Sequence, residues 1–286
     1  MTTVSTAWRG WTDGGAVGRT EESDEVDLQL HRAHSARMYD YFLGGTTNFA
    51  ADREAAGQAM AVFPWARTAA REYRAFMHRS VRALAGLGLD QFLDIGTGIP
   101  TSPNLHELAQ QANPRARVVY TDNDPVVLAH AQALLRSAAA GRTAYLQADA
   151  TDPERILASE EVRSTLDLGR PVALSLNALL HFVPGEEQAR AIVEHFKEVL
   201  PSGSTLAISH GTTEFAPAET ERVIQVYAAA GTPVRMRGRA EIARFFDGWQ
   251  LLDPGLVAVQ RWRPDTPPSS VSDAEVSGFA AVARKP

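Results

Sequence analysis

Five short apolar segments, separated by stretches with helical spacing, constrain the fold of this chain more than any other feature. Each segment is mostly apolar and does not alternate between apolar and polar residues, which is the pattern of strands covered by helices on both faces. Strands joined in this order by helical crossovers form a doubly wound parallel sheet. Strands are expected at residues 92–95, 118–120, 144–146, 172–176 and 206–208, with helices at 103–112, 125–139, 153–164 and 186–200.

The segment after Ile208 predicts a different end to the sheet. Helices are expected at 217–230 and 239–247, followed by two strands at 249–259 and 278–284. No helical pattern separates these last two strands, so they should pair as an antiparallel hairpin at one edge. The fold class is therefore α/β, with a mostly parallel seven-stranded sheet.

The N-terminal third divides into two regions. Residues 1–27 are rich in Gly, Ser, Thr and acidic residues, so we expect a flexible tail. Residues 28–90 have helical spacing and predict a helical cap or lid, with Asn48 capping its second helix. Residues 91–286 then form the Rossmann-like domain. One face of the third helix should be buried through Ala69, Tyr73, Phe76, Met77, Val81 and Leu84.

Composition excludes several classes of protein. The chain has 28 Lys and Arg against 34 Asp and Glu, a net charge of −6 that argues against binding nucleic acid or an anionic membrane. The absence of cysteine excludes disulfide scaffolds, thiol catalysis and cysteine-based metal sites, and fits a reducing compartment. No signal peptide or membrane span is evident, so we expect a cytoplasmic protein without a metal site. The oligomeric state is not indicated.

The first strand ends in Asp94-Ile95-Gly96-Thr97-Gly98, at the sheet edge where ligands bind in open α/β folds. Glycines at this turn let a ligand approach the backbone. A carboxylate beside the turn favours a cationic ligand, and position 101 lacks the glycine of a dinucleotide fingerprint. The alternative is a tight turn with an N-capping Asp94.

The next strand ends carry further carboxylates. Asp122 can accept both hydroxyls of a ribose, whereas Asp124 before Pro125 has the pattern of a helix cap. Asp149 can accept a hydrogen bond from an exocyclic amine, or it is an ordinary polar loop residue.

The fourth strand ends in Asn177 and is followed by His181. Asn177 offers both a donor and an acceptor. His181 is a candidate general base, because the ordinary pKa of histidine lies near neutrality. The alternative is a packed histidine with a structural role.

These four strand ends, in this order, resemble the class I S-adenosylmethionine-dependent methyltransferases. The resemblance implies that the glycine turn meets the methionine part of the cofactor, that Asp122 holds the ribose, and that Asp149 holds adenine. His181 would face the transferring methyl group. Pro100 departs from the family, which usually has a third glycine there. The residues implied in cofactor binding are Asp94, Gly96, Thr97, Gly98, Asp122, Asn123, Asp149, Ala150 and Asn177.

Longer motifs narrow the resemblance to one actinobacterial branch, long catalogued as a domain of unknown function. Its motifs resemble residues 37–45, 48–53, 92–98 and 180–184, and the resemblance covers roughly residues 28–284. Thr46-Thr47 stands where the branch usually has Lys-Asp, and Tyr73 where Asn is common, so substrate identity is not carried over. The branch points to an acceptor from specialised metabolism.

Two further segments have alternative interpretations. Residues 39–48 form an aromatic helix end before a Gly-Gly turn, which suits a lid over the cofactor or an amphipathic helix packed into the core. The lid would bring Tyr39, Tyr41, Gly44 and Gly45 to the cofactor. Arg235, Arg237 and Arg239 could hold a substrate carboxylate or lie in a solvated loop.

The sequence therefore predicts methyl transfer from S-adenosyl-L-methionine to an O, N or C atom of a small molecule, giving S-adenosyl-L-homocysteine. One alternative is an NAD(P)-dependent oxidoreductase on a similar sheet. The other is a catalytically inactive S-adenosylmethionine-binding regulator. Nucleic acid and membrane partners are not expected.

Overall fold

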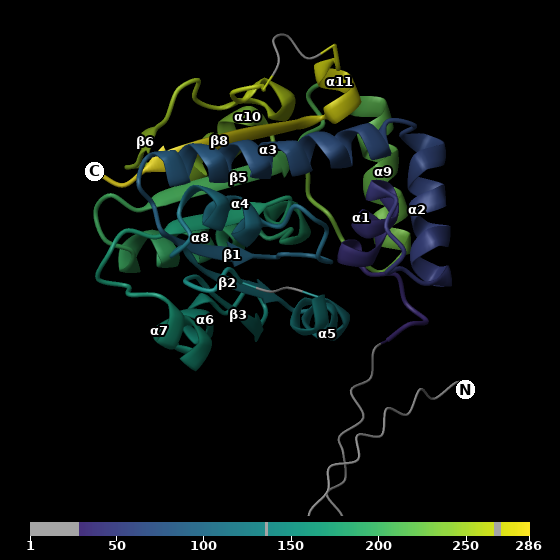
Figure 1. Ribbon diagram of the computed structural model, residues 1–286. Helices are drawn as coiled ribbons and strands as arrows, with labels where there is room; N and C mark the ends of the chain where they lie inside the picture. Colours follow the sequence, from purple (N-terminus) through teal and green to yellow (C-terminus); the bar gives the residue numbers. More distant parts are fainter. Residues whose placement is uncertain (1–28, 135–136, 266–269) are drawn as a thin grey trace, which may run out of the picture.

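The structure, a computed structural model, describes residues 29–134, 137–265 and 270–286, and the predicted tail lies outside these residues. Five parallel strands lie in the order β3-β2-β1-β4-β5; β8 pairs antiparallel with β5, and β6 pairs antiparallel with the other edge of β8 (Figure 1). The short β7 also pairs with β8. The strands are β1 (Gln91–Ile95), β2 (Arg117–Asp122), β3 (Arg142–Gln147), β4 (Ala173–Asn177), β5 (Thr205–Gly211), β6 (Gln250–Leu251), β7 (Val257–Ala258) and β8 (Gly278–Arg284).

The predicted parallel sheet with antiparallel C-terminal strands is confirmed, but one strand differs in length. The expected strand at 249–259 is broken into β6 and β7, so the sheet has eight strands instead of seven. Pro254 has no N–H to give to a ladder, and Gly255 turns the chain back at φ +84°. Both fragments still pair with β8.

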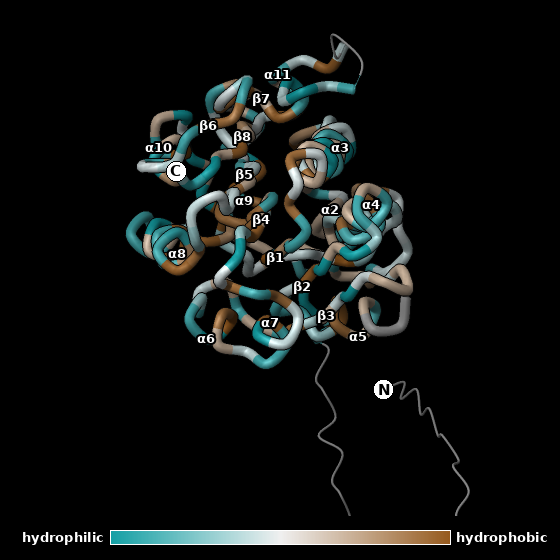
Figure 2. The backbone as a smooth tube through the Cα atoms, turned by 60° about the vertical axis from the view of Figure 1, so that its left-hand side comes forward, coloured by the Kyte–Doolittle hydropathy of each residue, from teal (hydrophilic) through white to brown (hydrophobic). Residues whose placement is uncertain are grey.

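Helices cover both faces of the sheet, which explains the continuously apolar strands. One face packs against α6, α7, α8 and α10, and the other against α3, α4 and α11. Figure 2 shows α3 and α8 on opposite sides of the strands. The helices are α3 (Ala66–Gly86), α4 (Leu105–Ala112), α5 (Pro125–Leu134), α6 (Pro153–Ala158), α7 (Glu160–Thr165), α8 (Glu186–Val199), α10 (Arg239–Ala243) and α11 (Asp273–Val276), with 3-10 turns η1 (Leu180–Phe182), η2 (Arg244–Phe246) and η3 (Val259–Arg261).

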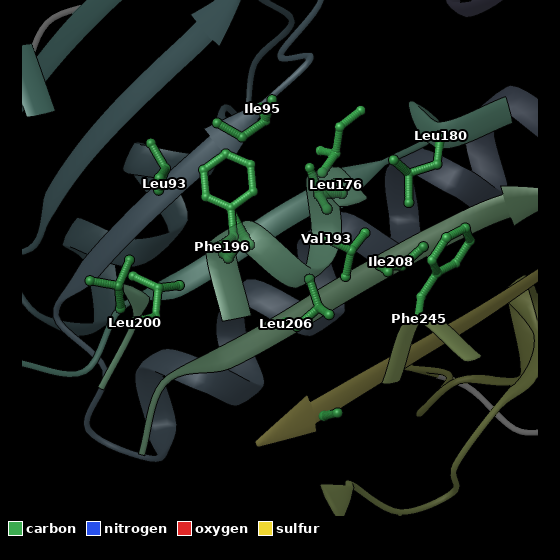
Figure 3. Packing of buried hydrophobic residues seen from close by; sticks show 14 of the residues in the cluster. Leu93, Ile95, Leu176, Leu180, Val193, Phe196, Leu200, Leu206, Ile208 and Phe245 are labelled. Atoms are coloured by element: carbon green, nitrogen blue, oxygen red, sulfur yellow. The ribbon is translucent and has the colours of Figure 1, made fainter. Parts of the chain in front are cut away.

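Alternation along each strand sends its residues to two different layers. In Figure 3, Leu93 and Ile95 of β1 face Phe196 of α8, in a cluster where all three are at most 1% exposed. Phe92, which precedes Leu93 and shares the parity of Asp94, packs on the α3 side. Asp94 therefore also points to the α3 side, and this parity decides which helix can reach it.

Two expected helices differ in detail from the prediction. The helix expected at 153–164 is interrupted at Ser159, which ends α6 and caps α7 by accepting from the Val162 N–H. The helix expected at 239–247 is α10 followed by the 3-10 turn η2. The local sequence gave no clear sign of the break at Ser159 or of the change from α10 to a 3-10 turn.

Three helices, α1 (Ser35–Leu43), α2 (Ala50–Val62) and α9 (Pro217–Ala229), lie together at one end of the sheet (Figure 1). Gly44 ends α1 with φ +85°, as expected. Asn48 is not the cap of α2; Phe49 is, and the Asn48 side chain instead donates to Asp40 Oδ2 at 2.8 Å.

A buried ion-pair cluster connects α1 to its neighbours. Arg37 Nε lies 3.5 Å from Asp52 Oδ1 of α2 and 3.4 Å from Asp124 Oδ2, just before α5. His34 Nδ1 lies 3.1 Å from the same Asp124 oxygen. Arg37 therefore joins α1 and α2 to the end of β2.

In the part of the chain that the structure describes, no helix has the length and apolar character needed to cross a membrane.

Candidate cofactor and substrate site

A cavity of about 460 Å³ lies where the carboxyl ends of β1–β4 meet the helices α1, α2, α3 and α9. We distinguish two parts of its wall. The polar half contains the strand-end residues with His34 and Arg74. The apolar half is formed by Phe63, Tyr73, Met77, Phe182, Tyr227 and Met236, with the smaller residues beside them.

Asp94 lies at the end of β1, only 7% exposed. Burial raises the pKa of Asp94 to about 6, against the opposing effects of the Ser175 and Thr97 hydroxyls and the Arg74 guanidinium. Arg74 projects from α3, on the same side of the sheet as Asp94. Its Nη2 donates to the carbonyls of Thr101 and Pro103. The two side chains place opposite charges at one end of the cavity.

The turn after β1 is fastened to the end of β2. The Gly98 N–H donates to Asp122 Oδ2 at 2.8 Å, and the Asp124 N–H donates to Asp122 Oδ1 at 3.0 Å. Gly98 has φ +68°, and a Cβ built there would meet nothing within 4 Å, so the backbone faces open space. Burial raises the pKa of Asp122, although these two N–H groups oppose the effect. This geometry leaves the Asp122 carboxylate able to accept further hydrogen bonds from a ligand.

The end of β3 presents Asp149 beside Asn123. Asn123 Nδ2 donates to Asp149 Oδ2 at 3.2 Å, and Thr151 donates to Oδ1 through its N–H and its hydroxyl. Burial raises the pKa of Asp149, but these hydrogen bonds outweigh it, and the pKa falls below its usual value. Asp149 is therefore an ionised acceptor at the outer end of the cavity.

At the end of β4, Asn177 Nδ2 donates to the Ser175 hydroxyl at 2.6 Å, and Ser175 hydrogen-bonds Asp94. His181 lines the cavity from η1 and accepts the Gly211 N–H at Nδ1, at 3.4 Å. The proton of the neutral ring is therefore on Nε2. Burial, with a contribution from the Arg237 guanidinium, lowers the pKa of His181 to about 3. The ring is uncharged at neutral pH and is a weak base.

The arginine cluster does not line the cavity, and the solvated-loop interpretation is wrong for Arg237. Arg237 is fully buried, 3.0 Å from Glu186 Oε2, and donates to the carbonyls of Leu180 and Val183. Arg235 pairs with Glu241 and Glu186. These side chains hold η1 and the segment after α9 together, and none of the three arginines lines the cavity, so the interpretation as a site for a substrate carboxylate is not supported.

The structure brings most of the predicted site residues into one wall. The residues that line the cavity are Tyr39, Asp94, Gly96, Thr97, Gly98, Asp122, Asn123, Asp149, Ala150, Asn177 and His181. Tyr41, Gly44 and Gly45 do not line it. Tyr41 stacks on Arg67, and Gly45 leaves room for Asp40, whose Oδ1 a Cβ would strike.

Sequence reasoning missed Arg74, His34 and Tyr227 as wall residues, and it noted Tyr73 as a buried position of the third helix and a departure from the branch, but not as a wall residue. All four lie on helices or helix ends, whose side chains reach the strand ends only after packing. A charged residue on the buried side of an amphipathic helix was the available signal for Arg74.

The polar half fits S-adenosyl-L-methionine. Arg74 keeps its buried Nε without a partner among the described residues, which suits the carboxylate of an amino acid. Asp94 suits the ammonium, Asp122 a ribose diol and Asp149 an exocyclic amine. The open space before Gly98 gives the ligand close access to the backbone. No group of three or more His, Cys, Asp or Glu side chains able to hold a metal lies within the described ranges.

Comparisons with known proteins agree with this chemistry. The model of a family described as S-adenosyl methyltransferase matches residues 20–286. A DUF574 family protein from Streptomyces avermitilis MA-4680 is 50% identical, with a TM-score of 0.88, over 91% of this chain and all of that one. A solved protein from Thermobifida fusca YX is 37% identical, with a TM-score of 0.85, over 92% of this chain and 99% of that one. No curated protein matches the chain.

Proposed function

Because the chain belongs to the S-adenosyl methyltransferase family, we propose that it transfers the methyl group of S-adenosyl-L-methionine to a small-molecule acceptor bound in the same cavity. The observation that carries this proposal is the placement of Arg74 and Asp94 beside Asp122 and Asp149 along one wall. Family membership and this carboxylate-rich wall both disfavour the oxidoreductase alternative, since a dinucleotide pyrophosphate would be repelled.

The cofactor supplies a methyl group made electrophilic by a positively charged sulfur. The residues of this chain bind the cofactor and the acceptor, orient them toward each other and exclude water. Arg74 and Asp94 would hold the zwitterionic end of the cofactor, and Asp122 and Asp149 would fix its nucleoside. Alignment of the two reactants is the main contribution that a protein can make to such a displacement.

His181 lines the cavity, and its ring lies beside that of Phe182 in the apolar half. With the pKa of His181 near 3, the ring stays neutral and its Nε2–H can orient an acceptor oxygen or nitrogen. We expect His181→Ala to lower turnover at least tenfold with little change in cofactor affinity. Unchanged turnover would remove His181 from the reacting site.

Calorimetric titration tests the proposal directly. The full chain is titrated with S-adenosyl-L-methionine, S-adenosyl-L-homocysteine and NADH. We expect micromolar binding of both sulfur ligands, loss of at least tenfold in affinity in Asp122→Asn, and no binding of NADH.

The matched control is Asp152→Asn, because Asp152 ends the same kind of strand–helix loop but only caps α6. Binding of NADH, or equal effects of the two variants, would contradict the cofactor assignment. Cofactor binding without transfer to any acceptor would support the inactive regulator instead.

The acceptor is proposed to be a small molecule because the site is a cavity of about 460 Å³ and the chain is acidic overall, with a net charge of −6. Nucleic acid and membrane surfaces are not part of the proposal. The cysteine-free composition supports action in the reducing cytoplasm.

A further inference from the structure

The apolar half of the cavity carries information about the acceptor, on the premise of the proposed function. The side chains on the cavity wall that carry or can gain charge within the described residues are His34, Arg74, Asp94, Asp122, Asp149 and the neutral His181. The first five belong to the polar half. The apolar half therefore has no side chain that would compensate a charge on the acceptor, and burying an uncompensated charge is unfavourable.

The nearest arginines do not change this conclusion. Arg237 is buried against Glu186 and His210, and Arg235 is paired with Glu241. Neither side chain lines the cavity. Among the described residues, an anionic acceptor would therefore find no cationic side chain in the apolar half of the cavity.

Two phenol hydroxyls in the apolar half lack partners. Tyr73 is 8% exposed and Tyr227 is partly buried, and both line the cavity without a hydroxyl partner among the described residues. The third tyrosine of the wall differs, because Tyr39 donates to the Ala70 carbonyl at 2.8 Å. Neither hydroxyl is among the fully buried side-chain atoms that lack a partner in the described residues, so both are accessible from the cavity and can donate to an oxygen or nitrogen of a ligand.

The Tyr73 hydroxyl lies near the end of β5, where His181 also makes contact. A Cβ on Gly278 would strike the Tyr73 hydroxyl, so that hydroxyl lies against the start of β8. Gly278 is the register partner of Gly211, whose N–H bonds to His181. Tyr73 and His181 therefore approach the end of β5 from two layers of the fold.

The rest of the apolar half suits a flat apolar skeleton. Phe182 lies 5.9 Å from Tyr227 between ring centroids and 4.4 Å from His181, which makes a row of three rings along one wall. Aromatic rings favour stacked or edge contacts with other rings at such distances. Met77 and Met236 can adapt around an irregular outline.

We propose that the acceptor is an uncharged ring compound with a hydroxyl or carbonyl oxygen, held by hydrogen bonds from Tyr73 and Tyr227. The ring packs against the row formed by Tyr227, Phe182 and His181. Burial raises the pKa of both tyrosines, so both phenols remain donors throughout the accessible pH range.

Three probes of equal ring size separate these requirements: 2-naphthol, naphthalene and 2-naphthoate. Each is titrated into the full chain saturated with S-adenosyl-L-homocysteine, with ring fluorescence as the readout. We expect 2-naphthol to bind at least tenfold more tightly than 2-naphthoate, and more tightly than naphthalene.

The variants Tyr73→Phe and Tyr227→Phe should each reduce the preference for 2-naphthol over naphthalene at least threefold. Tyr145→Phe is the control, because Tyr145 is a partly buried tyrosine outside this cavity. Affinity for S-adenosyl-L-homocysteine should stay within twofold in all three variants, which shows that they fold.

Three results would overturn the acceptor assignment: equal or tighter binding of 2-naphthoate, a naphthol preference unchanged in both tyrosine variants, or no binding of 2-naphthol at millimolar concentration. The proposed function fails by a different result, namely that the wild-type chain does not bind S-adenosyl-L-homocysteine. The probe titrations without that ligand then still test the apolar half.

Discussion

At the scale of single residues, the carboxylates were predictable and their partners were not. Asp94, Asp122 and Asp149 each follow an apolar strand, and parallel strands end at one edge, so their shared wall follows from local pattern and topology. Arg74 lies twenty residues before Asp94, on a helix whose rotation about its axis is fixed only by packing. The unpaired state of Tyr73 and Tyr227 is likewise visible only when every neighbour is in place.

Asp94→Asn should stabilise the ligand-free protein and weaken cofactor binding. The pKa of Asp94 is raised to about 6, so between roughly pH 4 and 6 the folded chain binds a proton that the unfolded chain does not. The buried charge therefore destabilises the fold above pH 6. This cost disappears as the pH falls below the pKa that Asp94 has in the unfolded chain. At pH 8 we expect a gain on the order of 2 kcal/mol in the free energy of unfolding.

Urea unfolding at pH 8 and pH 4 measures this gain, which should be absent at pH 4. Calorimetry on the same variant should show at least a tenfold loss of affinity for S-adenosyl-L-homocysteine. A variant that is less stable at pH 8 would contradict the assigned ionisation of Asp94.

The pH dependence of cofactor binding should follow Asp94 and not His181. Protonation of Asp94 removes the partner of the cofactor ammonium, so the affinity should fall as the pH decreases through about 6. His181 has a pKa near 3 and gives no inflection between pH 5 and 8. Titration of S-adenosyl-L-homocysteine from pH 5 to 8 checks this, and Asp94→Asn should flatten the curve.

At the scale of elements, apolar runs and stop signals located most strands and helices. The strands from β1 to β5 were predicted because a short, continuous apolar run between turn signals is typical of a strand buried on both faces. The break in the strand at 249–259 was not recognised, although Pro254-Gly255 gave a signal for it. The prediction that Asn48 caps α2 was wrong because its side chain has another partner. Asp40 offers the Asn48 amide a buried acceptor that the local sequence does not reveal.

Three glycines of the α1–α2 region should respond differently to alanine. Gly45→Ala should be the most destabilising, because the new Cβ would strike the Asp40 carboxylate. Gly44→Ala should cost about 1 kcal/mol, because φ +85° is unfavourable for a residue with a Cβ. Gly57→Ala, inside α2 with open space around it, should stabilise by roughly 0.5–1 kcal/mol.

Thermal unfolding of the three variants gives their order. If Gly45→Ala proved milder than Gly44→Ala, the packing of Asp40 against this turn would be refuted.

The ion-pair cluster that joins α1, α2 and α5 should respond to loss of its arginine. Arg37→Met leaves Asp52 and Asp124 buried with less compensation, and we expect a loss of roughly 3–5 kcal/mol in unfolding free energy. The control is Arg82→Met, which breaks an exposed pair with Asp265 and should cost at most about 1 kcal/mol. Equal losses in chemical denaturation would show that the cluster is not a structural connection.

At the scale of the whole molecule, the mostly parallel sheet, its antiparallel C-terminal strands and the location of the site followed from the order of elements, whereas the order of the strands in the sheet was not predicted. The face of the sheet that each helix covers could not be predicted in this way. It depends on which residues of each strand point to that face and on α3 lying along the sheet. Thus the polar half of the cavity was predictable in outline, and the apolar half, built from α2, α3, α9 and the segment before α10, was not.

Cofactor binding should stabilise the molecule as a unit, since the strand ends and α1 share one cavity. At a hundredfold excess over the dissociation constant, S-adenosyl-L-homocysteine should add about 2.7 kcal/mol to the free energy of unfolding. Amide hydrogen exchange should slow in α1 and α2 together with the loops after β1 and β2. Protection confined to those loops would show that the helices do not respond to the ligand.

The place of β8 has a consequence for the timing of folding during synthesis. Its residues come last among the strands, yet they insert between β5 and β6, and Gly278 at its start contacts the Tyr73 hydroxyl of α3. A ribosome releases α3 some two hundred residues before β8. The nascent chain can therefore assemble the parallel strands and their carboxylates early. The apolar half of the cavity is completed only when residues 278–284 have emerged. Binding of an acceptor would then report that translation of this domain has passed its final strand.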